Sequence, residues 1–295
     1  MTFGEWLTTC EAVVELHTRA RLRQTQAGEH RSVATGKGLR LRHYEAYRPG
    51  DERRLIDWKA SRKEHTLLLR RFEAERRLAV VALCDVSASM LFGQHFPKHR
   101  MLLDCAGLLG LATLRQGDAF GLLAFATDTV AYFPPQQRRE TTLQALEYLW
   151  TYAPPGEANA PTLLAPVLQY LPTHQPLLLC LLSDFRMPDW QETLDVLSAT
   201  HDTIAVCIAE ETEIALEAVG HIVVRDLESG QLMELDTAST ACRRAYYEYM
   251  LTERRAREQL LQRACGAQYV MAHPTTDYRG DLLRLFLART ARTWI

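Results

Sequence analysis

The chain has 295 residues, of which 47% are hydrophobic, and a formal net charge of -2, which suits one large domain with an appendage and a sizeable core. No apolar run approaches the roughly 20 residues that span a bilayer, and the N-terminus has no signal-peptide pattern, so we expect no transmembrane segment and no secretion. The seven cysteines are scattered without a CxxC pair, which argues against zinc and thioredoxin-type sites and favours a cytoplasmic protein.

The first segment of the chain predicts a helix. Within residues 3–26, apolar side chains recur at spacings of three and four positions, as they do on one face of an amphipathic helix. We therefore assign residues 1–27 to an N-terminal amphipathic helix and expect its apolar face to pack on a core.

Residues 28–77 form a distinct basic unit. Its first glycines break any helix, the pair Pro49-Gly50 predicts a tight turn, and residues 67–72 have the pattern of a strand, so we expect a β-rich element. From Arg19 to Arg77 the chain carries 17 Lys and Arg against 8 Asp and Glu, a net of +9, and the remainder carries -11. We favour a segment that lies against the acidic remainder or faces solvent; the alternative is a docking surface for an acidic partner or nucleic acid.

From residue 78 onward, predicted strands and helices alternate. Strands are expected at 79–85, 119–126, 129–133, 177–183, 203–209 and 221–225, with helices at 98–115, 139–152, from about 162, and at 190–200. This alternation predicts an α/β fold with a doubly wound, mostly parallel sheet of six strands, one of which is an antiparallel hairpin strand. A long helix at 238–264, a strand at 268–272 and a last helix from about 280 form a C-terminal extension of this domain, which spans 78–295.

Side chains with oxygen ligands follow two of the predicted strands. Asp85 ends the first strand, Ser87 and Ser89 follow it at alternate positions, Thr162 stands at an expected helix start, and Asp184 ends a later apolar run. Open α/β sheets bind ligands at the carboxyl ends of their strands. Two carboxylates and three hydroxyls suit a hard divalent cation, so we predict a site for Mg²⁺, with Mn²⁺ or Ca²⁺ also compatible. For Asp85, Ser87 and Ser89 alone, the alternative is a capped turn.

This order of Asp, Ser, Ser, Thr and Asp resembles the metal-ion-dependent adhesion site of von Willebrand factor A domains. Nearly the whole chain resembles the bacterial family called domain of unknown function 58. The resemblance rests on the segments Gly28–Ser32, Gly36–Gly38, Tyr47–Arg62 with its GD-x-x-R-x-IDW motif, Phe72–Glu75, Asp85–Ser89 and Ser183–Phe185. It implies a von Willebrand factor A-like (Rossmann-like) domain at 78–295 behind the basic block, and association with MoxR-type AAA+ ATPases in the assembly or activation of other proteins.

The motif inside the basic block allows two interpretations. Asp51 and Asp57 stand among arginines, as in a ligand clamp or a catalytic pair. We favour a salt-bridged turn that docks the basic block onto the von Willebrand factor A-like domain, with Trp58 as its apolar anchor.

Three functions are compatible with these patterns. The favoured one is a non-enzymatic, metal-dependent protein-protein interaction module, whose cation takes a carboxylate from a MoxR-type ATPase or its client. A metal-dependent hydrolase at the same site is the first alternative, but a serine nucleophile needs an oriented base and the sequence suggests none; we predict no catalytic residue. Nucleic-acid binding through residues 19–77 is the second, and it lacks a recognised motif.

Overall fold

The computed structural model shows a chain of two compact units. Unit 1 comprises residues 1–23 and 78–295, and unit 2 comprises residues 24–77, so unit 2 is an insertion between two parts of unit 1. The structure describes residues 1–26, 40–48, 51–73, 78–91, 97–126, 129–152, 168–172, 175–186, 190–210, 214–225, 231–265 and 268–292.

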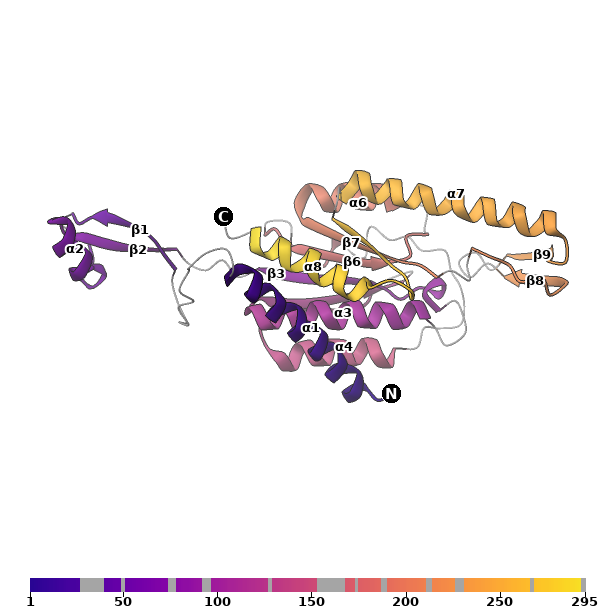
Figure 1. Ribbon diagram of the computed structural model, residues 1–295, viewed down its shortest axis with the longest axis horizontal. Coiled ribbons are helices and arrows are strands. Elements are labelled where there is room, and N and C mark those ends of the chain that lie inside the picture. The colour runs from indigo at the N-terminus through magenta and orange to yellow at the C-terminus, as the bar shows by residue number, and fades with distance from the viewer. Residues whose placement is uncertain are drawn as a thin grey trace. The chain divides into compact units, whose positions relative to one another are not determined.

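Unit 1 is built on a six-stranded sheet with the order β10-β7-β6-β3-β4-β5 (Figure 1). Its strands are β3 (Ala79–Asp85), β4 (Ala119–Phe125), β5 (Thr129–Gln136), β6 (Leu178–Ser183), β7 (Asp202–Ile208) and β10 (Tyr269–Ala272). Strand β5 is antiparallel to β4, and the other neighbours are parallel. The strands β3, β4, β6 and β7 are almost continuously buried and apolar, as expected for a parallel sheet covered on both faces. The prediction of a mixed α/β fold with a mostly parallel sheet is confirmed.

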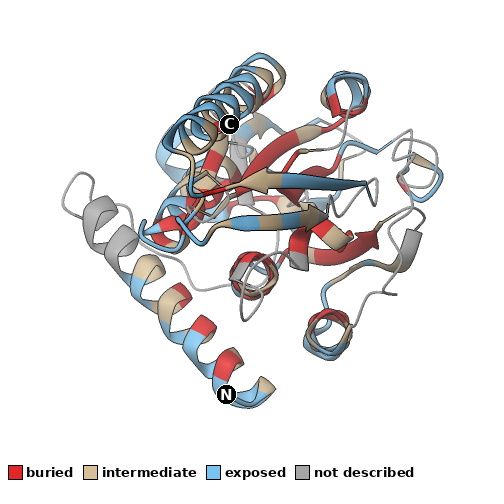
Figure 2. Cartoon of the chain, turned by 90° about the vertical axis from the view of Figure 1, so that its right-hand side faces the viewer, coloured by how far each residue is buried: buried red, intermediate tan, exposed pale blue. Residues whose placement is uncertain are grey.

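Helices cover both faces of this sheet. The α-helices in the described residues of unit 1 are α1 (Phe3–Gln26), α3 (Pro97–Gln116), α4 (Arg139–Thr151), α6 (Trp190–Thr200), α7 (Thr240–Cys265) and α8 (Tyr278–Arg292). Alternate residues of β3 point to opposite cores: Val80 and Ala82 pack with α1, α3, α4 and α8, and Val81 packs with α6 and α7. Figure 2 shows the burial of the strands and of the helix faces turned toward them. Across the described residues, no helix is both long and apolar enough to cross a membrane.

The prediction for residues 221–225 was wrong in one respect. These residues form strand β8 (His221–Arg225), but β8 pairs antiparallel with β9 (Leu232–Asp236) in a separate hairpin rather than joining the central sheet. The edge position beside β7 is occupied by β10, which the chain reaches through α7. Local sequence patterns mark a strand but do not identify its partner, and a short connection favours the antiparallel hairpin.

Helix α1 is held on unit 1 by a buried aromatic anchor. Trp6, Cys10 and Val14 are buried, and the indole Nε1 of Trp6 donates to Asp104 Oδ1 at 2.7 Å. The hydroxyl of Tyr278, at the start of α8, donates to the other oxygen of Asp104 at 2.8 Å. The helices α1 and α8 are therefore both hydrogen-bonded to one carboxylate on α3.

The described part of unit 2 after residue 39 contains two antiparallel strands and two short helices. They are β1 (Arg40–Ala46), the 3-10 helix η1 (Arg53–Leu55), α2 (Trp58–Glu64) and β2 (Leu68–Glu73). Asp57 caps α2 by accepting from the backbone N–H groups of Lys59 and Ala60, and it also accepts from the hydroxyl of Tyr44 at 2.9 Å. Asp57 therefore organises a turn within the unit. Trp58 is exposed on unit 2, and its expected role as the apolar anchor of the basic block stays a prediction.

Candidate metal centre

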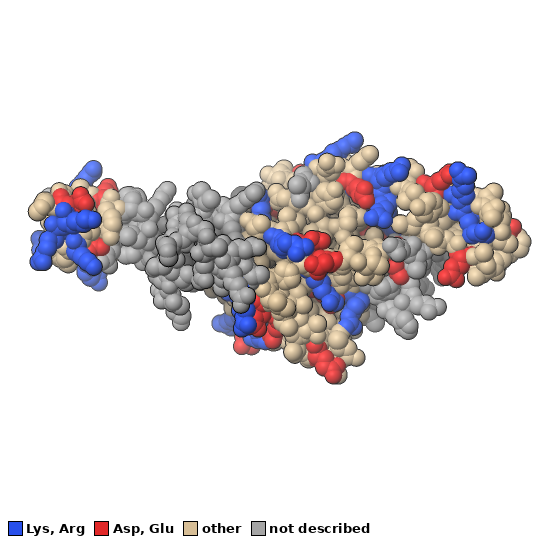
Figure 3. Space-filling view, in the orientation of Figure 1, with Lys and Arg blue, Asp and Glu red and all other residues tan. Residues whose placement is uncertain are grey.

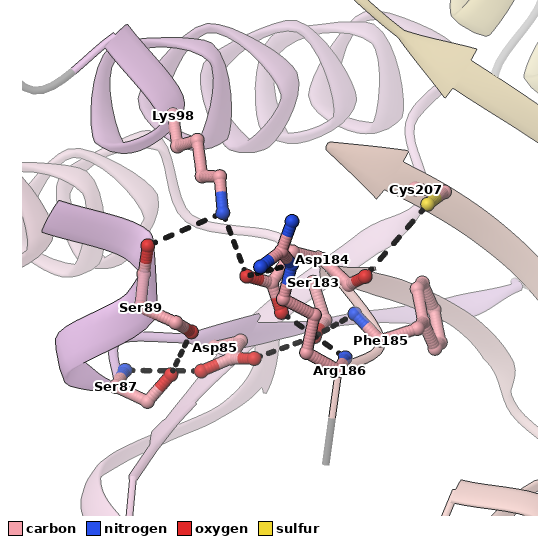
Figure 4. Close-up of polar contacts among 9 residues, drawn as sticks. All are labelled: Asp85, Ser87, Ser89, Lys98, Ser183, Asp184, Phe185, Arg186 and Cys207. Atoms are coloured by element: carbon pink, nitrogen blue, oxygen red, sulfur yellow. Dashed lines mark hydrogen bonds and ion pairs between the residues drawn. The ribbon is translucent and has the colours of Figure 1, made fainter. Parts of the chain in front are cut away.

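The two carboxylates predicted to bind metal lie at the carboxyl edge of the sheet, on adjacent strands. Asp85 is the last residue of β3, and Asp184 follows directly after β6. The two strands are parallel neighbours, with Cys84 opposite Leu182, so their ends come together. Figure 4 shows both aspartates with Ser87, which follows β3, and Ser89, which lies in the 3-10 helix η2 (Ala88–Leu91).

Asp85 is fully buried and held by hydrogen bonds on both oxygens. Its Oδ1 accepts from the backbone N–H of Ser87 at 3.0 Å, and its Oδ2 accepts from the hydroxyl of Ser183 at 2.5 Å. The hydroxyls of Ser87 and Ser89 are 3.1 Å apart and also buried. The structure thus brings together Asp85, Ser87 and Ser89 in one buried cluster of oxygen atoms. Thr162, the remaining predicted ligand, lies outside the described residues.

Asp184 is bound to two basic residues. The ammonium Nζ of Lys98, on the first turn of α3, donates to Asp184 Oδ2 at 2.8 Å and to the backbone carbonyl of Ser89 at 3.3 Å. The backbone N–H of Arg186 donates to Asp184 Oδ1 at 3.2 Å, and its guanidinium Nε lies 3.9 Å from Oδ2. Lys98 is completely buried, and Asp184 is 2% exposed. Because this ion pair is shielded from water, the attraction between its two charges is stronger than it would be on the surface.

The two carboxylates differ in their acidity. Burial and the nearby charge of Asp184 raise the pKa of Asp85 to about 7. Burial opposes ionisation of Asp184, but the ammonium of Lys98 and the charge and N–H group of Arg186 together outweigh burial, so the pKa of Asp184 lies below its ordinary value. Asp184 is therefore the ionised member of the pair, and Asp85 carries the electrostatic penalty.

This arrangement fits a hard divalent cation. Asp85, Ser87, Ser89 and Asp184 offer only oxygen ligands, which Mg²⁺ prefers, and Mg²⁺ keeps several waters so that few protein oxygens suffice. A cation beside Asp85 would relieve the penalty of ionising a second buried carboxylate. Clusters of three or more His, Cys, Asp or Glu are absent from the described residues; a site of two carboxylates and hydroxyls does not require one.

Three residues that shape this site had no role in it predicted from the sequence: Lys98, Ser183 and Arg186. A lysine in the first turn of a helix is normally solvated, so only the fold shows that Lys98 is buried. Ser183 ends an apolar strand, and its hydroxyl both donates to Asp85 and accepts from the N–H of Phe185 at 2.9 Å. A signal was available in the pair Ser183-Asp184, because polar residues that end a buried strand seldom serve packing.

Ser183→Ala is expected to lower the free energy of unfolding by about 1–3 kcal/mol, because it leaves a buried carboxylate oxygen and a buried N–H without their partner. The measurement is chemical denaturation in EDTA. Ser198→Ala, which removes a hydroxyl from the C-terminal half of α6, is the matched control. Equal stability of the Ser183 variant and the wild type would contradict the positioning of Asp85 by Ser183.

Comparison with known proteins gives a family. Residues 43–257 match the model of the family described as "Protein of unknown function DUF58". The chain belongs to this family. It is 25% identical over 280 residues to uncharacterized proteins of Mycobacterium tuberculosis (Rv1480) and Mycobacterium bovis (Mb1516), covering 94% of this chain and 87% of each relative.

Solved structures show a more distant likeness. The conserved hypothetical protein BatB from Bacteroides thetaiotaomicron is 13% identical, with a TM-score of 0.48, covering 73% of this chain and 99% of that one. An aerotolerance-related membrane protein from Bacteroides fragilis is 12% identical, with a TM-score of 0.46, covering 71% of this chain and 97% of that one.

Proposed function

We propose that this protein is a non-enzymatic, metal-dependent protein-protein interaction module with a von Willebrand factor A-type domain. The observation that carries the proposal is the pairing of Asp85 and Asp184 at the carboxyl edge of the sheet, with the hydroxyls of Ser87 and Ser89 beside Asp85. These four residues, with Thr162 from the sequence pattern, would hold Mg²⁺. The sheet order, with one antiparallel edge strand, is compatible with such a domain.

The partner's contribution follows from the chemistry of the site. A cation held by few protein oxygens keeps positions for other ligands, and a carboxylate is a suitable ligand for Mg²⁺. The attraction between such a carboxylate and the cation is strong only where both are partly removed from water, as they would be beside these buried side chains. We propose that the partner is a MoxR-type AAA+ ATPase or its client, supplying an Asp or Glu.

Hydrolysis at the same site is less well supported. The hydroxyls of Ser87 and Ser89 are hydrogen-bonded to one another, and the nearby amine of Lys98 is committed to Asp184 as an ion pair. A lysine held in an ion pair is not available as the oriented base that a serine nucleophile needs.

Nucleic-acid binding through the basic block has one observation in its favour. Figure 3 shows Lys and Arg side chains gathered on the visible face of unit 2. The exposed basic residues described there are Arg48, Arg53, Arg54, Lys59, Arg62 and Lys63. Exposed charges of this kind act mainly on association rates and weaken with salt, so they would assist docking of an acidic partner or bind nucleic acid non-specifically.

The test measures binding of the full chain to a MoxR-type ATPase from the same organism by biolayer interferometry. We expect the two proteins to bind in the presence of Mg²⁺. Binding should be lost in EDTA and should return when Mg²⁺ is restored. Ser87→Ala should weaken it at least about tenfold, since the hydroxyl is a direct ligand in the proposed site. Ser198→Ala, on α6 and outside the proposed ligand set, should bind as the wild type does.

An interaction that ignores EDTA and Ser87→Ala, but disappears at moderate salt, would assign binding to the basic block instead. Binding of duplex DNA with a steep salt dependence would favour the nucleic-acid alternative.

A further inference from the structure

Lys98 is a buried cation inside the candidate metal centre. Its side chain is completely buried, and its ammonium contacts Asp184 Oδ2 at 2.8 Å and the carbonyl of Ser89 at 3.3 Å. Figure 4 shows the lysine reaching from α3 toward Ser89 and Asp184. Removing an ammonium from water costs several kcal/mol unless a partner compensates, so this position depends on Asp184.

The ammonium changes the charge that a bound metal would experience. Asp85 and Asp184, both ionised, would present two negative charges to a divalent cation. Lys98 cancels one of them through direct contact, and Arg186, 28% exposed, lies 3.9 Å from the same carboxylate. The attraction for a divalent cation is therefore weaker than two aspartates alone would give.

We infer that Lys98 is the resident counter-ion of this centre and sets a low affinity for divalent cations. Without metal, its ammonium keeps Asp184 neutralised and in place, so the site stays folded. With metal, the like charges of Lys98 and the cation oppose one another, so the cation exchanges readily. The inference rests on the proposed metal site, and it adds a regulating residue: loading of the site, and with it partner binding, would follow the concentration of free Mg²⁺.

The test replaces Lys98 in the full chain and measures Mg²⁺ binding by calorimetry and Mn²⁺ binding by electron paramagnetic resonance. Lys98→Met removes the charge and keeps an unbranched side chain; Lys98→Gln also keeps a donor for Asp184, in case the methionine variant folds poorly. Both variants are expected to bind either cation at least about tenfold more tightly than the wild type, because one repelling charge is gone. Lys98→Arg, which keeps the charge, should stay near the wild type. The matched control is Lys59→Met, because Lys59 is an exposed lysine of unit 2.

Thermal denaturation gives a second readout. Without metal, Lys98→Met should melt at a lower temperature than the wild type, and saturating Mg²⁺ should raise its melting temperature by more than it raises that of the wild type. A purely structural lysine would lower the melting temperature without tightening metal binding.

Two results would overturn the inference, and they differ in meaning. If the wild type binds Mg²⁺ and the folded Lys98→Gln variant binds it equally or more weakly, Lys98 is not a competing charge, and the proposed function stands. If neither the wild type nor any variant binds Mg²⁺ or Mn²⁺ at millimolar concentration, the metal site itself is wrong, and the inference falls with it.

Discussion

Asp184→Ala is expected to lower the free energy of unfolding by about 3–5 kcal/mol, because it removes the carboxylate that the buried ammonium of Lys98 contacts at 2.8 Å. The sequence alone would predict a loss of metal binding with the fold intact; the buried ion pair makes stability the larger effect. Chemical denaturation in EDTA measures it. Asp195→Ala, an exposed acid on α6, is the control and should change stability little.

A second substitution separates the ion pair from other effects of Asp184. In the double variant Asp184→Ala/Lys98→Met, both members of the buried ion pair are removed together, and most of the lost stability should return. If the double variant is less stable than Asp184→Ala alone, Lys98 stabilises the fold through contacts other than this pair, and an unpaired ammonium is not the cause of the lost stability.

Asp85→Asn is expected to abolish Mg²⁺ binding while making the metal-free protein about 1–2 kcal/mol more stable at pH 7. Asparagine keeps an oxygen to accept from the N–H of Ser87 but removes a charge that is costly to bury. The pKa of Asp85 is raised from 3.8 to about 7 by burial first and then by Asp184. A shift of this size corresponds to at most about 4 kcal/mol, of which the buried amide would take back a part.

The difference in stability between the wild type and Asp85→Asn depends on pH. Because the pKa of Asp85 is higher in the folded state, its favourable contribution is complete below pH 3.8 and is lost as the pH rises through about 7. In EDTA, the stability of the wild type relative to Asp85→Asn should therefore fall between pH 4 and 7 and stay level above pH 8. Denaturation of both proteins across this range, with Asp195→Asn as control, measures the difference. Parallel pH profiles for the wild type and Asp85→Asn would contradict a raised pKa.

The sequence was informative where local patterns determine structure. Continuous apolar runs marked β3 and β6 as strands buried on both faces, and because parallel strands share a carboxyl edge, Asp85 and Asp184 could be expected to meet. The antiparallel hairpin of β4 and β5 was likewise visible as two strands joined by a short connection. Each of these conclusions needed only the residues of one or two neighbouring segments.

The sequence was uninformative where contacts between distant segments determine the structure. Strand β8 has the pattern of a sheet strand, yet β10 takes the edge position beside β7, and nothing in residues 221–225 reveals this competition. Lys98 has the sequence context of an exposed helix start, and its burial follows from the packing of α3 against β3 and β6. The charge balance of the candidate site was therefore hidden until the elements were assembled.

The insertion of unit 2 gives the basic block two covalent tethers. The chain leaves unit 1 after residue 23 and returns to it at Leu78, so a single proteolytic cut on either side would leave the block attached through the other connection. A cut on the N-terminal side would turn α1 into a separate peptide, but the burial of Trp6 and its hydrogen bond to Asp104 would retain that peptide on unit 1. A truncation that starts after α1 would keep the block and expose the surface that Trp6 covers.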